Sequence, residues 1–508
     1  ETNDEDQNNN NNNRGNNKND HETKTSKFIY SPEEKKLLRK INLTTIPFIC
    51  TVAFLQYLDK ISLNYSVAMG LYEDTNTTSG DLSWLGAIFY LGYLLFQIPN
   101  QYFLQRYSIS KYLGTCLILW GAVLTCTSLA KNFHQLLVLR FLQGFFEAAA
   151  YPCLQLLIST VYRRSGGEQV TLFGIMLCTN SFATTIGGLI GFGFLSLNGI
   201  NGLSGWKWCM IILGSVTMIV GVITFLILPD RAESRWYRLT AIEMDIVEDR
   251  IRDNTIVKSK IIKWNHIFEA LREARFYCYI LISFLTHLLN GCVTIFSTTI
   301  IKSMGFSVSY IFTQFNINME SILLNIPTGV TAILLVLLSV YLSRRFDSNS
   351  YVGAFMCCIT FIGVLLLTVL PEGVYMLIGI FLSNIGSVST LVLSSISNNV
   401  SGYTKIVFYN GSYLIAFCLG NFLGPLLIFP HEAPRYLTGM SIYMASMLIS
   451  AILFLYARWT CVRDNRYRQQ LNAENKIPSE QQTTSTIDKN QQGGDLTDKQ
   501  DLRFMYRP

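Results

Sequence analysis

Residues 135–161 read QLLVLRFLQGFFEAAAYPCLQLLISTV. The stretch is long enough to cross a bilayer as a helix, since a spanning helix needs about 20 mostly apolar residues. It carries two ionisable side chains, Arg140 and Glu147. They stand seven residues apart, so a helix places them on one face with about 10 Å between them. A long apolar run with charges on one face predicts a membrane helix whose polar groups serve a function.

The rest of the chain has the same character. Of its 508 residues, 50% are hydrophobic and 15% are charged, whereas soluble domains carry about 25% charged residues. The charges concentrate in the first 40 residues, near 230–275 and in the last 50. This distribution excludes a soluble enzyme and a nucleic-acid-binding protein. The 12 cysteines lie in or beside apolar runs without metal-ligand spacing, so we expect neither a disulfide framework nor a metal site.

The apolar sequence divides into twelve predicted spanning helices, at 41–70, 82–104, 112–130, 135–161, 169–197, 208–228, 275–301, 321–342, 351–370, 373–397, 402–429 and 436–459. They form two blocks of six, 41–228 and 275–459, joined by a charged cytosolic linker at 229–274. We therefore predict an all-α membrane protein of two pseudo-symmetric six-helix bundles. Residues 1–40 and 460–508 are polar and low in complexity, and we expect them to be disordered cytosolic tails.

Two six-helix blocks joined by a linker are typical of transporters that rock around a central substrate site. A receptor or a structural protein with twelve spans is the alternative. A nucleotide-driven pump is excluded, because the sequence has no GxxxxGK[ST] loop.

The basic residues of the connections predict the orientation, because cytosolic loops are enriched in Lys and Arg. Connections on the side of the N-terminus hold Arg106, Lys111, Arg163, Arg164, Arg344, Arg345 and Lys405. Connections on the opposite side hold Lys131, Lys207, Lys302 and Arg435. Both termini are thus predicted to be cytosolic. Asn76 then lies outside, and Asn76-Thr77-Thr78 is an acceptor sequence for N-glycosylation.

Ionisable side chains inside spans are rare here, and such groups usually face a cavity or each other. Span one carries Asp59 and Lys60, with Gln56 and Lys60 on one helical stripe. Span four carries Arg140 and Glu147. A static ion network is the competing explanation. We favour a functional one, because buried ion pairs do not reliably stabilise a fold; for Lys60 the two readings are even.

These residue types suggest distinct roles. The planar fork of Arg140 suits a carboxylate or sulfonate, and Lys60 and Gln56 are further candidates to bind substrate. Asp59 and Glu147 are candidate proton carriers. Neutral polar side chains on other spans are candidates for selectivity, with hydrogen bonding between helices as the alternative for each: Tyr151, Asn180, Asn290, Asn384 and Asn410. We expect His287 to be a hydrogen-bonded helix residue rather than a proton relay.

The segment RFLQGFFEAAAYP at 140–152 resembles the span-four signature of the major facilitator superfamily, and within it that of the anion:cation symporters. LDKISLNY at 58–65 resembles the acidic–basic pair of their first span, with the Lys typical of the fungal allantoate permease branch. Segments SGYTK at 401–405, GNFLGP at 420–425, APRY at 433–436, and DLTD at 495–498 with FMY at 504–506 are also similar. The resemblance implies that Arg140 holds the substrate anion, and that Asp59 and Glu147 carry protons.

One segment departs from the family pattern. The connection between spans two and three has Gln105 where the superfamily usually has an aspartate. A gate at the cytosolic side would therefore rely on the basic residues of this connection and its counterpart in the second block, namely Arg106, Lys111, Arg344 and Arg345.

Together these features predict a proton-coupled symporter that imports a small organic anion, such as a ureidocarboxylate, a vitamin carboxylate or a sulfur-containing acid, by alternating access. We expect no cofactor besides the coupling proton, and a monomer in a fungal plasma membrane. Two alternatives stay open. One is an exporter of metabolites or drugs with the same fold, against which Arg140 argues. The other is a nutrient sensor that binds without transporting, against which the short tails argue.

Overall fold

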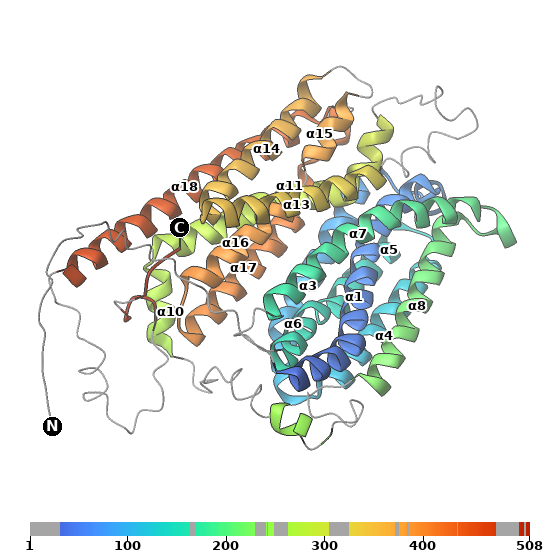
Figure 1. Cartoon of the computed structure of the whole chain (residues 1–508). Coiled ribbons are helices and arrows are strands. Elements are labelled where there is room, and N and C mark those ends of the chain that lie inside the picture. Colours follow the sequence, from blue (N-terminus) through green and yellow to red (C-terminus); the bar gives the residue numbers. More distant parts are fainter. Residues whose placement is uncertain are drawn as a thin grey trace, which may run out of the picture.

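The computed structural model describes residues 31–162, 168–228, 240, 242–247, 263–303, 325–370, 375–383, 386–433, 435–473, 497–501 and 504–507. Long helices in two bundles make up this part of the chain (Figure 1). The first bundle contains α1 (Pro32–Ala68), α2 (Leu71–Thr75), α3 (Ser79–Arg106), α4 (Ile109–Thr127), α5 (Phe133–Glu147), α6 (Ala150–Val161), α7 (Glu168–Ser196) and α8 (Gly205–Ile227).

The second bundle follows the linker and the short helix α10 (Trp264–Leu271). It contains α11 (Ala274–Ser303), α13 (Asn325–Phe346), α14 (Asn349–Val369), α15 (Met376–Leu382), α16 (Gly386–Asn399), α17 (Tyr403–Leu423) and α18 (Leu437–Ala473). Among the described residues, eleven helices are long and apolar enough to cross a membrane, counting α5 with α6 and α15 with α16 as single spans. The twelfth is α3, which packs against both α5 and α17. The predicted fold class is therefore confirmed.

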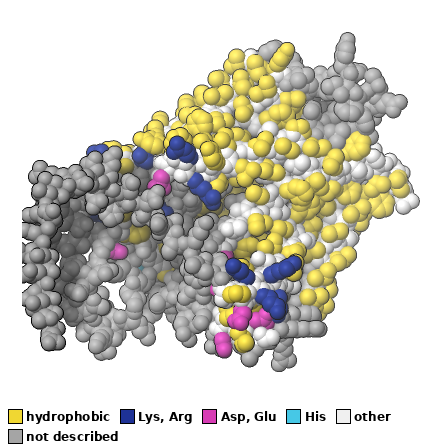
Figure 2. Space-filling view, in the orientation of Figure 1, with side chains coloured by type: hydrophobic (Ala, Val, Ile, Leu, Met, Phe, Trp, Pro, Cys, Tyr) yellow, Lys and Arg dark blue, Asp and Glu magenta, His cyan; other side chains and the backbone are white. Residues whose placement is uncertain are grey.

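Hydrophobic side chains cover the outside of the helices, while charged ones gather near the start of α1 and the last turns of α18 (Figure 2). We call this the tail end, because α1 begins and α18 finishes there, and the opposite end the loop end. The exposed side chains Val222, Leu226, Leu334, Ile452 and Leu455 belong to this apolar surface. In water such a surface would be unfavourable, so it fits contact with lipid.

Several helix boundaries differ from the sequence prediction. Span four is interrupted between α5 and α6, because Pro152 has no N–H to donate to the carbonyl of Ala148. The first helix begins at Pro32, nine residues before 41, where Ser31 caps it by accepting a hydrogen bond from the Glu34 N–H at 3.1 Å. The last helix continues past 459 to Ala473. Both predicted tails are thus shorter than expected, since charged residues extend these helices beyond the apolar span.

The two bundles meet at the loop end. Asn64 on α1 donates to Ser297 Oγ on α11 at 2.7 Å, and the Thr298 N–H donates to Asn64 Oδ1 at 3.0 Å. Ser297 Oγ in turn donates to Asn325 on α13 at 2.9 Å. Towards the tail end the ribbons of the two bundles splay apart (Figure 1). The structure therefore shows a state in which the bundles are joined at the loop end.

Within the first bundle, glycine lets α5 approach α3 closely. A Cβ atom at Gly144 would collide with the backbone carbonyl of Phe89 on α3. Gly92 on α3 has the same relation to the carbonyl of Phe141 on α5. This close crossing positions the Arg140–Glu147 face of α5 towards α1.

Candidate functional site

The charged side chains of spans one and four come together inside the first bundle. Asp59 and Lys60 extend from α1, and Arg140 and Glu147 extend from one face of α5. Asp59, Arg140 and Glu147 are each at least 97% buried. We call these four residues the central site. Two carboxylates and two cations make it formally neutral when all four are ionised.

Lys60 and Glu147 form a direct ion pair. The distance from Lys60 Nζ to Glu147 Oε1 is 3.0 Å. The ammonium also lies 5.5 Å from the ring centroid of Tyr93 and 5.9 Å from that of Phe89, both on α3. At these distances the faces of aromatic rings attract a cation. The Lys60 side chain keeps 13% of its surface exposed, whereas that of Glu147 has none, so Lys60 is the part of the pair that a solute can reach.

Asp59 is held by neutral donors instead. Trp120 Nε1 on α4 donates to Asp59 Oδ2 at 2.8 Å, and Gln143 Nε2 on α5 donates to the same oxygen. Gln143 lies one helical turn from both Arg140 and Glu147, so it belongs to the same face of α5. The sequence-based site did not include Trp120, although a buried indole N–H usually requires an acceptor.

Arg140 lacks partners for part of its guanidinium. Its Nε and Nη2 atoms are buried and make no hydrogen bond within the described residues. Arg140 and Asp59 also form no ion pair within the described residues, and Asp59 accepts from Trp120 and Gln143. Gln56 is buried beside Glu147, and both of its amide atoms also lack hydrogen-bond partners in the part of the chain that the structure describes. Buried polar groups without partners are uncommon in proteins and call for an explanation.

The other predicted substrate contacts are less uniform. Tyr151 Oη accepts a hydrogen bond from Asn180 Nδ2 at 3.0 Å, which ties α6 to α7. Asn290 donates to Asn421 Oδ1 at 2.8 Å, which is the interhelical arrangement given above as the alternative. Asn410 is exposed on α17, and Asn384 lies outside the described residues.

His287 on α11 is a hydrogen-bonded core residue. Its Nδ1 lies 2.6 Å from the carbonyl of Ser283, one turn earlier, and its Nε2 lies 3.2 Å from Ser389 Oγ on α16. The ring packs against Phe417 at a centroid distance of 4.5 Å. These contacts agree with the structural role expected for it.

The predicted gating residues sit on the surface of the tail end. Arg106, Lys111, Arg344 and Arg345 are exposed. Arg106 Nη1 donates to Tyr102 Oη at 3.4 Å within its own helix. No ion pair connects these four residues to the opposite bundle within the described residues, so their role as a gate stays a prediction.

Asn76, the predicted glycosylation site, is exposed at the loop end. It terminates α2 with a left-handed backbone conformation (φ 51°). The side chain is therefore accessible for modification, which itself stays a prediction.

A second buried charge cluster lies at the tail end of the second bundle, around Lys405 on α17. Its Nζ is 2.8 Å from Glu269, 2.6 Å from Glu273 and 2.7 Å from Asp498. Lys405 is completely buried. The three carboxylates have the spacing of a metal site, but the Lys405 ammonium already supplies their cation.

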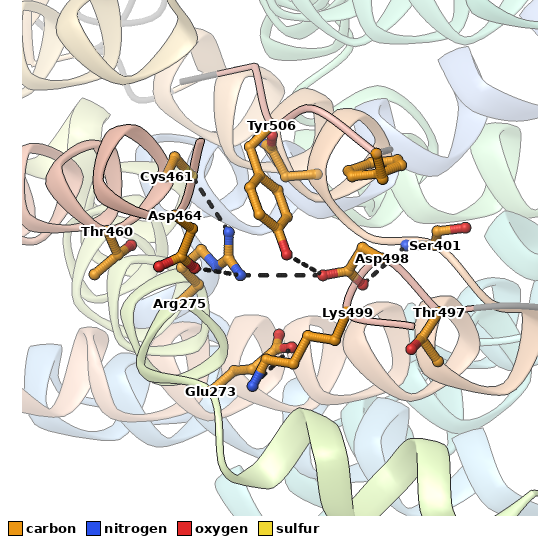
Figure 3. A network of polar contacts seen from close by, with 12 residues as sticks. Glu273, Arg275, Ser401, Thr460, Cys461, Asp464, Thr497, Asp498, Lys499 and Tyr506 are labelled. Carbon is orange, nitrogen blue, oxygen red and sulfur yellow. Dashed lines mark hydrogen bonds and ion pairs between the residues drawn. The ribbon is translucent and has the colours of Figure 1, made fainter. Parts of the chain in front are cut away.

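The chain's own C-terminus completes this cluster. We call residues 497–501 and 504–507 the C-terminal segment; Figure 3 shows how Asp498 and Tyr506 of this segment meet Arg275. The Arg275 guanidinium lies 3.7 Å from the centroid of the Tyr506 ring. Burial raises the pKa of Tyr506, so its hydroxyl stays protonated and donates to Asp498 Oδ2 at 2.8 Å.

The same segment contacts α16 and α18. Arg507 N–H donates to Asn399 Oδ1 at 2.7 Å, and Arg468 on α18 donates to the Asp498 carbonyl at 2.7 Å. The C-terminal segment thus connects α10, α11, α16, α17 and α18. The sequence analysis did not predict this docking. The available signal was the resemblance of DLTD and FMY to the C-terminal end of the family's sequences.

Comparison with known proteins gives a consistent assignment. Residues 49–425 match the Major Facilitator Superfamily. The chain is 32% identical over 480 residues to the uncharacterized transporter C417.10 of Schizosaccharomyces pombe, covering 93% of this chain and 89% of that protein. It is 28% identical over 495 residues to the allantoate permease of Saccharomyces cerevisiae, covering 94% and 87%.

The solved structures agree on the fold. A bacterial homologue of the human lysosomal transporter Spinster, in an inward-facing and unoccupied conformation, superposes with a TM-score of 0.60 at 15% identity, over 81% of this chain and 94% of that one. The matched proteins are transporters, so the chain is a transporter of small metabolites and not an enzyme. The chain belongs to the major facilitator superfamily, among fungal transporters that include the allantoate permease of Saccharomyces cerevisiae.

Proposed function

We propose that the protein is a proton-coupled symporter that imports a small organic anion. The supporting observation is the central site. There Lys60 pairs with Glu147, and two guanidinium nitrogens of Arg140, on the same face of α5 as Glu147, have no hydrogen-bond partner within the described residues. Arginine N–H groups without an internal acceptor suit a carboxylate or sulfonate from outside. The allantoate permease is a relative, and a ureidocarboxylate is one member of this substrate class; vitamin carboxylates and sulfur-containing acids are others.

Charge balance gives a reason for coupling to protons. With Asp59, Glu147, Lys60 and Arg140 ionised, the central site has no net charge. A monovalent anion adds one negative charge, which is costly to enclose in a low-dielectric interior. One proton on a site carboxylate restores neutrality, so the bundles can close around the loaded site. The expected ratio is one proton for each monovalent anion.

The Lys60–Glu147 pair suggests how the exchange takes place. Protonation of Glu147 would remove its attraction for Lys60, and the ammonium could then bind the substrate anion together with Arg140. Release of the proton would restore the pair and displace the anion. Lys60 would thus bind Glu147 and the substrate anion in alternation.

The orientation completes the proposal. The tail end is the cytosolic face and the loop end is the outer face of the plasma membrane, in line with the distribution of Lys and Arg. Because the bundles are joined at the loop end by Asn64, the structure corresponds to the state that releases substrate. Asp59 and Glu147 are the two candidates to carry that one proton, and Tyr151, Asn180 and Gln56 are the neutral substrate contacts of the proposal.

Uptake of radiolabelled anions by a yeast strain lacking its own permeases tests the proposal. Accumulation should follow an inward proton gradient and collapse with a protonophore. Glu147→Gln should abolish gradient-driven accumulation but retain exchange of substrate across the membrane, whereas Glu73→Gln, at an exposed glutamate on α2, should transport normally. Accumulation that survives Glu147→Gln unchanged would contradict the coupling role. Net efflux under the same gradient would identify an exporter, and binding without flux would identify a sensor.

A further inference from the structure

We infer that Trp120 and Gln143 hold Asp59 as a permanent carboxylate, so that Glu147 alone exchanges the proton. Trp120 and Gln143 are positioning residues in this scheme: they act through Asp59 and not on the substrate. The inference deepens the proposed function, and its statement about proton coupling rests on that function. The assignment of protonation states to the two acids can be tested without any substrate.

The contacts of Asp59 favour its ionised form. Its Oδ2 accepts from an indole N–H and an amide N–H, groups that can only donate. Hydrogen bonds donated to a carboxylate stabilise the charge and oppose protonation. The nearby hydroxyl of Ser62 donates to the Asp59 carbonyl at 2.6 Å and lies 3.5 Å from Oδ1. One carboxylate oxygen of Asp59, Oδ2, is therefore already the acceptor of two protein N–H groups.

Charged neighbours act in the same direction. The titratable groups that face Asp59 are Arg140 and Glu147 from α5, Lys60 from α1, and the thiol of Cys209 from α8. The Arg140 and Lys60 cations favour an ionised Asp59, and Cys209 is a buried neutral thiol that adds no charge. Burial itself opposes the charge, so the donors and cations act against this cost. Among the charged neighbours, Glu147 opposes ionisation of Asp59, and it would lose this effect when it takes up a proton.

Glu147 has the opposite surroundings. It is completely buried, and neither of its carboxylate oxygens has a hydrogen-bond partner of good geometry in the described structure. Among the described residues its ion-pair partner is Lys60, at 3.0 Å, and Lys60 is the partly exposed member of the central site. Protonation of Glu147 therefore weakens its ion pair with Lys60, whereas protonation of Asp59 would weaken two N–H bonds at once.

Charge balance agrees with this division of roles. The neutral central site needs one proton to compensate one monovalent anion. Protonating both acids would leave Lys60 and Arg140 with a net positive charge once a monovalent anion is bound. A fixed Asp59 carboxylate prevents this, because it stays as the counter-charge of Arg140 through the cycle.

Infrared difference spectroscopy of the purified full chain in lipid can follow each acid during a pH titration. A buried carboxyl group that takes up a proton gains a carbonyl band that its carboxylate lacks. In the wild type we expect one such band from the central site, which disappears in Glu147→Gln and persists in Asp59→Asn. Trp120→Phe should add a second band, and this band should be absent when Asp59→Asn is combined with Trp120→Phe.

The size of the effect follows from one lost hydrogen bond to a charged group. We expect the pH at which Asp59 protonates to rise by about one to two units in Trp120→Phe. Gln143→Leu keeps the approximate shape of the side chain but removes its N–H donor, so it should shift the protonation of Asp59 in the same direction. It serves as the second variant if Trp120→Phe does not fold. Trp206→Phe is the matched control, since buried Trp206 donates to Asp74 at 2.9 Å, away from the central site.

The outcomes separate the inference from the proposed function. A wild-type band that is lost in Asp59→Asn, or donor variants that titrate like the wild type, would overturn the inference. If the bands behave as expected while uptake ignores the proton gradient, the inference stands and the proposed symport fails. In transport assays the donor variants should raise the ratio of protons to anions above that of wild type and Trp206→Phe, which a purely structural role would not do.

Discussion

Replacing Lys405 with methionine would remove the ammonium that Glu269, Glu273 and Asp498 share. The ligand oxygens of these acids lie within 4.8 Å of one another, and Nζ lies 2.6–2.8 Å from each. Removing one partner of a buried ion pair typically costs about 3–5 kcal/mol, because the remaining charge stays uncompensated. Lys499, 3.5 Å from Glu273, offers partial relief, so we expect a loss near the lower bound, about 3 kcal/mol.

The assay is the unfolding of purified protein in detergent, with a tag after residue 508 to follow its protease sensitivity. Lys405→Met should lower the unfolding midpoint and release the C-terminal segment to protease. Lys111→Met is the control, because Lys111 is an exposed lysine at the same end. If Lys405→Met unfolds like Lys111→Met and keeps its tag protected, the cluster does not hold the C-terminal segment.

Three further predictions concern other parts of the molecule. Asn64→Ala removes two hydrogen bonds between the bundles, which at about 1 kcal/mol each should favour opening of the loop end; spin labels across that end should report longer distances, and unchanged distances would refute the gate. Lys40 donates to Glu243 at 2.6 Å, and this bond, with the Thr240 N–H, lowers the pKa of Glu243. The Lys40–Glu243 contact is therefore complete above the ordinary carboxyl pKa and is lost as the pH falls through the lowered pKa of Glu243. Proteolysis of the linker should accelerate below about pH 4 in the wild type, and already at neutral pH in Lys40→Ala. Equal cleavage rates for the wild type at neutral and at acidic pH, or for the wild type and Lys40→Ala at neutral pH, would contradict this role of the contact. Asn76→Gln should abolish a glycosidase-sensitive gel shift if the loop end faces outward, and a wild type without such a shift would argue against that orientation or against use of the site.

The sequence predicted the bundles well because lipid imposes a simple rule. An apolar stretch of span length must satisfy its backbone hydrogen bonds internally, so it becomes a helix. The four residues of the central site were also found from sequence, because charges in such helices are rare. Their pairing was not. Sequence spacing placed Arg140 and Glu147 on one face but could not show that Lys60 reaches Glu147 while Asp59 turns towards Trp120.

Lys405 illustrates why the tail end was harder to predict. In the sequence it was one more basic residue in a connection, counted as evidence for orientation. In the structure it is completely buried under a segment that is 92–102 residues away along the chain. Such docking depends on contacts between charged residues from separated segments, and neither hydropathy nor periodicity records them. The resemblance of residues 495–498 and 504–506 to the C-terminal end of the family's sequences was the one available signal that this segment has a role.

The two buried charge clusters contain the same residue types but differ in how completely they are satisfied. Around Lys405, the ammonium meets three carboxylates, and Tyr409 donates to Glu273 at 2.6 Å. In the central site, by contrast, Arg140 and Gln56 have buried atoms that find no hydrogen-bond partner in the part of the chain that the structure describes. Leaving such groups unmatched costs about 1–3 kcal/mol each. A cluster with a purely structural task has no reason to retain this cost, whereas a site that must admit an anion and a proton needs donors that the protein does not use itself. Incomplete hydrogen bonding, more than charge or burial, therefore distinguishes the proposed transport site from the cluster around Lys405.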